Sequence, residues 1–120
     1  MPFIVNGRDV LRMQGVYYTV TGLWPLVHMT SFEAITGPKT DDWLVKMVGL
    51  LAAVIGGTLF IAAGRTHASP EIRFLAIASA LAFAAIDTWY SLQGRIAMVY
   101  LADAVVELLI ISLLATSKWR

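Results

Sequence analysis

Four apolar segments of nearly membrane-spanning length follow one another along this chain, with short connections between them. They cover residues 13–31, 43–63, 74–92 and 96–115. A transmembrane α-helix needs about 20 predominantly apolar residues, so each segment is long enough to cross a bilayer. Because short links make successive helices antiparallel neighbours, we predict an all-α polytopic membrane protein. Its four transmembrane helices would form an up-down-up-down bundle, with residues 1–120 as a single domain.

Composition supports the membrane class and excludes several functions. Hydrophobic residues make up 58% of the chain and charged residues 14%, against about 45–50% and about 25% in soluble domains. A soluble chain of this size could not bury so much apolar surface. A net charge of +1 argues against nucleic-acid binding, which needs a basic surface. The absence of cysteine rules out disulfides and thiolate metal sites.

Lys and Arg are unevenly divided between the two sides of the predicted bundle. One side carries Arg8, Arg12, Arg65, Arg73, Lys118 and Arg120, and the other carries Lys39, Lys46 and Arg95. Cytoplasmic flanks of membrane helices are enriched in Lys and Arg. We therefore expect both termini in the cytoplasm and residues 32–42 facing outward, in a bacterial inner membrane.

Three carboxylates interrupt the last two apolar segments. Asp87 lies in the third segment, and Asp103 and Glu107 lie in the fourth. Ionisable groups within a membrane span are costly, and they usually face a bundle interior or a wet cavity as part of a site. We place the outer interface near Leu92 and Ile96. At ~1.5 Å per residue, Asp87 then lies about 7–8 Å deep, Asp103 about 10 Å and Glu107 about 16 Å.

Polar and aromatic side chains recur at a similar depth on the other predicted helices. The first segment carries a stripe at helical spacing, formed by Gln14, Tyr17 or Tyr18, Thr21, Trp24 and His28. Asp103 and Glu107 are four residues apart and share one helix face. Four antiparallel helices would bring these groups to one pocket that opens outward. The predicted ligand-binding residues are Asp87, Asp103, Glu107, Tyr100, Tyr90, Trp24, Trp89, Tyr18, Thr21, His28 and Lys46.

The chemistry of this predicted pocket favours a cation. Two carboxyl groups one helical turn apart in a low dielectric resist being ionised together, so the pair holds a proton or binds a cation that displaces it. Cations are also attracted to aromatic faces. We therefore expect a protein that binds, and in a proton-coupled form transports, a cationic or amphiphilic small molecule.

An intramembrane enzyme acting on a lipid or isoprenoid-like substrate is the first alternative. Glu107 or Asp103 would be its general acid. Asp87 or His28 would be the base, provided that acid and base reach one substrate atom. These side chains include donors that suit Mn, Fe or Zn. The sequence has no compact ligand spacing of the H-x-x-x-H type, however, and we predict neither a metal nor another cofactor.

A structural or accessory subunit is the second alternative. Asp87 and Asp103 would then form internal ion pairs with Lys46 or Arg95, since buried charges are normally paired. In this hypothesis the acids would stabilise the bundle and bind no ligand.

Two further features predict how the helices pack. Pro25 removes a backbone hydrogen bond to Thr21, so the first helix should kink in its outer third. Small residues recur every fourth position in the second and third segments, at Ala52 and Gly56, at Ala53 and Gly57, and at Ala76, Ala80 and Ala84. Such faces allow close helix approach in lipid. We expect them to pack the second helix on the third, or to form a homo-oligomer.

In size and four-span plan the chain resembles the small multidrug resistance transporters. That family carries its essential glutamate in the first span, whereas residues 13–31 contain no carboxylate. The resemblance therefore covers the plan of the bundle and assigns no site residue.

Overall fold

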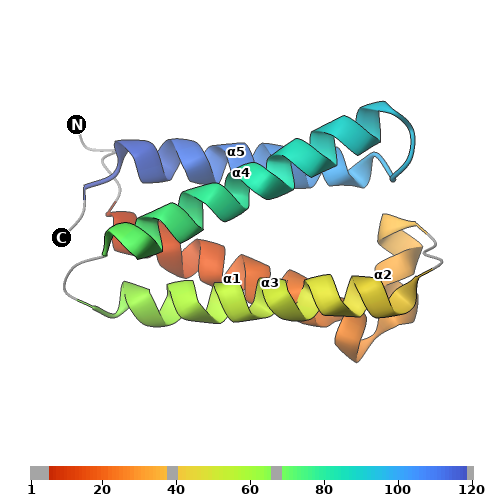
Figure 1. Cartoon of the computed structure of the whole chain (residues 1–120), viewed down its shortest axis with the longest axis horizontal. Helices are drawn as coiled ribbons and strands as arrows, with labels where there is room; N and C mark the ends of the chain where they lie inside the picture. Colours follow the sequence, from red (N-terminus) through yellow and green to blue (C-terminus); the bar gives the residue numbers. More distant parts are fainter. Residues whose placement is uncertain (1–5, 38–40, 66–68, 119–120) are drawn as a thin grey trace.

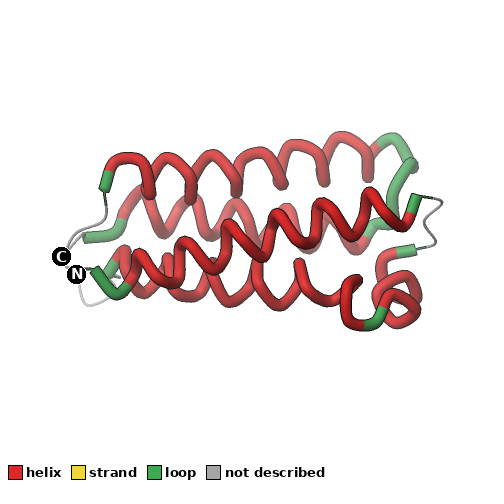
Figure 2. The backbone as a smooth tube through the Cα atoms, turned by 60° about the horizontal axis from the view of Figure 1, so that its bottom comes forward, coloured by secondary structure: helices red, strands yellow, loops and turns green. Residues whose placement is uncertain are grey.

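The computed structural model describes residues 6–37, 41–65 and 69–118, and these residues form five helices. The helices are α1 (Gly7–Val27), α2 (Met29–Thr36), α3 (Asp42–Ala63), α4 (Pro70–Leu92) and α5 (Val99–Thr116). The all-α prediction is confirmed. The four long helices run along one axis, and the short α2 turns across one end (Figures 1 and 2).

Three of the described helices, α3, α4 and α5, are long and apolar enough to cross a membrane. They correspond closely to the second, third and fourth predicted segments. α1 has 21 residues but is less apolar, because Arg8, Asp9 and Arg12 lie near its start and Gln14 follows. Three described helices are therefore long and apolar enough to cross a membrane, whereas we predicted four such segments.

The first predicted segment, residues 13–31, does not form one continuous helix. Helical hydrogen bonding continues past Pro25, where the N–H of His28 donates to the Trp24 carbonyl at 2.8 Å. The chain then turns at His28 (φ −150°, ψ 83°), whose Nδ1 accepts a hydrogen bond from the Ser31 N–H at 3.2 Å and so caps α2. We expected a kink at Pro25, and the helix ends three residues later, at His28.

Glycines hold α1 and α3 in close antiparallel contact. A Cβ added at Gly15 would lie 2.6 Å from the Gly56 carbonyl oxygen. Two helical turns further along α1, Gly22 approaches Gly49 of α3 in the same way. Only residues without a side chain allow backbones to come this near. We expected the small-residue face of the second segment to pack on the third, but it packs mainly on α1 and contacts α4 little.

The second helix pair is formed by α4 and α5, which are joined by a short turn (Figure 1). Ala76, Ala80 and Ala84 of α4 are buried. The two pairs meet in an apolar core near the described chain ends, built from Val10, Leu11, Leu59, Ala63, Ala76, Ala80, Ile110 and Leu114. Buried Gln14 joins the pairs, because its Nε2 donates to the Ala76 carbonyl at 2.9 Å.

The described ends of the chain lie side by side at this closed end of the bundle (Figures 1 and 2). The Gly7 N–H donates to the Lys118 carbonyl at 2.7 Å, and Arg8 donates to the Arg65 carbonyl at 2.9 Å. Lys39 and Arg120, which entered the charge count above, lie outside the described residues. At the opposite end the helix pairs diverge, and α2 lies there (Figure 1).

Candidate functional site

A cavity of about 500 Å³ lies between the two helix pairs, on the side of the core away from the described chain ends. All five helices contribute to its wall. It is lined by Tyr17, Tyr18, Thr21, Gly22, Trp24, Pro25, Phe32, Ile35, Thr36, Leu44, Val45, Val48, Gly49, Ala52, Phe83, Asp87, Val99, Tyr100, Ala102, Asp103, Val106 and Glu107. Most of these residues are apolar or aromatic. A cavity of this size, with few polar groups, has the character of a small-molecule site.

Asp87, Asp103 and Glu107, the three acids of the predicted spans, all line this cavity. Asp87 is 6% exposed and Glu107 is 1% exposed, while Asp103 is partly buried. Asp87 comes from α4, and Asp103 and Glu107 lie one turn apart on α5. Asp103 is close enough to act electrostatically on both of the other carboxyl groups. The structure therefore brings together the carboxylates that the sequence placed at similar depths.

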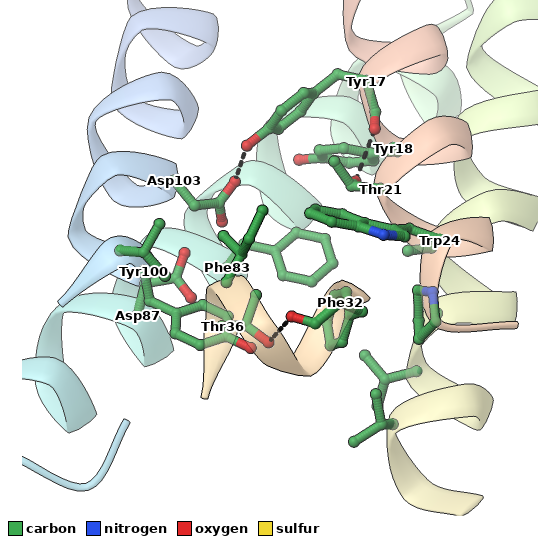
Figure 3. A pocket seen from close by; sticks show the side chains of 18 of the residues that line it. Tyr17, Tyr18, Thr21, Trp24, Phe32, Thr36, Phe83, Asp87, Tyr100 and Asp103 are labelled. Atoms are coloured by element: carbon green, nitrogen blue, oxygen red, sulfur yellow. Dashed lines mark hydrogen bonds between the residues drawn. The ribbon is translucent and has the colours of Figure 1, made fainter. Parts of the chain in front are cut away.

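Two consecutive tyrosines of α1 donate hydrogen bonds across the cavity to α5. The Tyr17 hydroxyl donates to Oδ1 of Asp103 (Figure 3). The Tyr18 hydroxyl donates to Oε1 of Glu107 at 2.5 Å, and both partners are buried. A hydrogen bond to a carboxylate is stronger than one between neutral groups. These two bonds fix the carboxylates of α5 in place.

Asp87 differs from the other two acids. Its Oδ2 is buried and receives no hydrogen bond from any described residue. Figure 3 shows its carboxyl group beside Tyr100 and near Asp103, on the opposite side of the cavity from α1. A buried oxygen acceptor without a donor is costly. A ligand that donates to this oxygen would therefore remove that cost.

Aromatic side chains form the remaining wall. Tyr18 packs edge-on against Phe83, with ring centroids 5.2 Å apart. Trp24 packs edge-on against Phe32 of α2, at 5.4 Å, and its indole N–H donates to the Ser31 hydroxyl at 2.8 Å. The last two contacts attach α2 to α1, and α2 contributes Phe32 and Thr36 to the cavity wall (Figure 3).

Four predicted ligand-binding residues lie outside the cavity lining. Trp89 is 63% exposed, and Lys46 is exposed near the start of α3. Tyr90 packs with Arg95, whose guanidinium carbon lies 5.9 Å from the ring centroid. His28 is exposed and caps α2, because the break in the first segment turns it away from the stripe that it was predicted to extend. His28 therefore does not reach the cavity as the base of the enzyme alternative.

The internal ion pairs of the structural alternative are not formed between the residues that the structure describes. Neither Lys46 nor Arg95 forms an ion pair with Asp87 or Asp103, and no described Lys or Arg lines the cavity. The acids consequently face one another without a described cationic partner.

Sequence reasoning missed several residues of the cavity. We predicted that either Tyr17 or Tyr18 would belong to the polar stripe of the first segment. We did not predict that both would reach a carboxylate. We did not predict Phe32 and Thr36 as cavity residues, because we did not predict α2 as a separate helix. Phe83 lies four residues before Asp87, and this spacing was a signal that could have identified it.

Comparisons with protein-family models, with characterised proteins and with solved structures find no match for this chain.

Proposed function

We propose that this protein is an integral membrane protein that binds a small organic cation with an apolar body in the cavity between its helix pairs. The observation that carries this proposal is the meeting of Asp87, Asp103 and Glu107 in an aromatic-lined cavity that no described Lys or Arg lines. Asp87 and Glu107 are the two buried acidic side chains among the described residues, and both line this cavity.

A bound cation would compensate the charge of the three carboxyl groups. A buried carboxylate is expensive unless it is paired or protonated, and three of them close together add mutual repulsion. A ligand with one positive charge relieves both costs. Its apolar body would contact the aromatic wall, where ring faces attract cations. Because a proton and a cation would compete for the same carboxyl groups, the site also suits proton-coupled exchange, which is the transport form of the proposal.

The proposed arrangement in the membrane uses α1 as a fourth crossing helix. α1 pairs with α3 along its length, and its 21 residues span about 31 Å at 1.5 Å per residue, close to the thickness of the hydrocarbon core. Arg8 and Arg12 would then lie at the cytoplasmic interface with the chain ends. The cavity would open toward the outer side, since the apolar core fills the bundle at the cytoplasmic end.

Ligand-induced thermal stabilisation in a neutral maltoside detergent tests the proposal. The probes are octylammonium and octyltrimethylammonium, with octanol as the uncharged comparison. Both cations should raise the unfolding midpoint and octanol should not, because a ligand that binds the folded state stabilises it. Glu107→Gln should weaken binding of both cations about tenfold or more, since a hydrogen-bonded or charged contact contributes roughly 1.5–3 kcal/mol.

Glu71→Gln is the matched control, because Glu71 is an exposed acid in the first turn of α4 and lies outside the cavity lining. It makes the same charge change and should leave cation binding at the parent level. Equal stabilisation by octanol and the cations, or full binding by the Glu107→Gln variant, would contradict the proposed site.

A further inference from the structure

We propose that the bound cation carries at least one N–H bond, and that this N–H donates to Oδ2 of Asp87. The preferred ligand class is then a primary, secondary or tertiary ammonium with an apolar substituent, and a quaternary ammonium should bind more weakly. This inference rests on the proposed function and specifies which cations the cavity prefers.

The three carboxyl groups of the cavity are not equivalent. Asp103 accepts a hydrogen bond from Tyr17, and Glu107 accepts one from Tyr18. Asp87 has no such donor at Oδ2, although its side chain is more than nine-tenths buried and lines the cavity. Asp87 is therefore the carboxyl group that a ligand must satisfy.

The groups that surround Asp87 do not supply the missing hydrogen bond. The charged groups that act on Asp87 are Asp103 and Glu107, which are acceptors when ionised. Tyr100 lies beside the Asp87 carboxyl group (Figure 3), but Oδ2 receives no hydrogen bond from it or from any other described residue. A donor that also carries positive charge would compensate the carboxyl cluster and complete the hydrogen bonding of Asp87 at the same time.

A quaternary ammonium can meet only part of this requirement. Its charge is attracted to the carboxyl groups and to the aromatic wall, but it has no N–H. On binding, it would displace water from the cavity and leave Oδ2 buried without a donor, which carries the full desolvation cost of that oxygen. A tertiary ammonium of nearly the same size avoids this cost with its single N–H.

Stepwise N-methylation of one ligand isolates this effect. The probes are octylammonium and its mono-, di- and trimethyl derivatives, and the measurement is the dissociation constant for the parent protein in neutral detergent. Each added methyl group buries more apolar surface and should strengthen binding modestly. At the last step, from dimethyl to trimethyl, we expect binding to weaken about tenfold, because that step removes the last N–H.

Asp87→Asn tests whether Asp87 is the acceptor. This variant should bind the ammonium ligands more weakly. The drop between the dimethyl and trimethyl compounds should shrink, because a neutral amide oxygen is a weaker acceptor than a carboxylate. Glu71→Gln should keep that drop. If Asp87→Asn fails to fold, the methylation series on the parent protein still decides the question of N–H preference.

The outcomes separate this inference from the proposed function. Affinity that rises smoothly through the trimethyl compound would overturn the N–H preference while leaving cation binding in place. A drop that is undiminished in Asp87→Asn would show that another group accepts the hydrogen bond. Failure of the whole series to bind would overturn both proposals.

Discussion

At the scale of single residues, neighbouring tyrosines reach different carboxylates. Successive residues of an α-helix point about 100° apart, so Tyr17 and Tyr18 cannot share one face. Tyr18 is 2% exposed and donates to the deepest acid, Glu107, while Tyr17 is partly buried and donates to Asp103. Gln14 and Ser79 also lie beside the Tyr18 hydroxyl. Tyr18 is thus the central hydrogen-bond donor of the cavity.

We predict that Tyr18→Phe lowers the free energy of unfolding by about 1–3 kcal/mol, because it leaves the buried Glu107 carboxyl group without its donor. Tyr17→Phe should cost less, because Tyr17 and Asp103 are both less buried. Denaturant or thermal unfolding in detergent measures both effects.

Two comparisons make this prediction specific. Tyr90→Phe removes a hydroxyl outside the cavity and should leave stability within about 0.5 kcal/mol of the parent. The double variant Tyr18→Phe/Glu107→Gln should be less destabilised than the sum of its single variants, because the two residues share one interaction. Additive effects would show that the hydrogen bond contributes little.

At the scale of helices, α1 and α3 are matched by their glycines. A Cβ at Gly56 would lie 2.5 Å from the Gly15 carbonyl oxygen and 2.8 Å from the Thr19 nitrogen, whereas a Cβ at Gly57 would meet no atom within 4 Å. Backbone atoms cannot move aside as a flexible side chain can. The close approach of the two helices therefore depends on Gly56 and not on its neighbour.

These adjacent glycines provide a matched pair of variants. Gly56→Ala should destabilise the protein by about 1–3 kcal/mol or more, the usual cost of overpacking. Gly57→Ala should be neutral or stabilising by up to about 1 kcal/mol, because alanine favours a helix more than glycine does. Unfolding midpoints in detergent distinguish the two, and equal effects would contradict the α1–α3 contact.

At the scale of the whole molecule, the two helix pairs are joined at one end and separated at the other. The apolar core and the contact between Gly7 and Lys118 close the end with the chain termini. The cavity and α2 occupy the opposite half (Figure 1). If the helices cross the membrane as proposed, a ligand would enter the cavity from one side of the membrane only.

The proposed orientation predicts which connections face each side of the membrane. The chain has no cysteine, so single cysteines can be introduced without background labelling. In right-side-out membranes, an impermeant maleimide should label Gln93→Cys, in the turn after α4. It should label Arg65→Cys, in the turn after α3, only once the membrane is opened. The reverse pattern would invert the topology, and labelling of both from one side would show that α4 does not cross.

The sequence by itself determined the helical class and the bounds of three helices. The predicted segments 43–63, 74–92 and 96–115 differ from α3, α4 and α5 by at most four residues at either end. These bounds follow from local chemistry, namely long apolar runs ended by polar turns. The Ser69 hydroxyl, for example, caps α4 by accepting a hydrogen bond from the Ile72 N–H. The spacing of Asp103 and Glu107 also fixed their common face in advance.

Only the tertiary structure decided which helices pair and which side chains meet. The small-residue pattern of α3 suits any close partner, and the glycines of α1 determine that α1 is that partner. The break at His28 depends on how α2 packs against Trp24, which a hydropathy pattern does not record. Likewise, whether Asp87 has a hydrogen-bond donor depends on the residues that α1 and α5 bring to it. Contacts between distant segments are absent from local sequence, because they arise from the packing of whole helices.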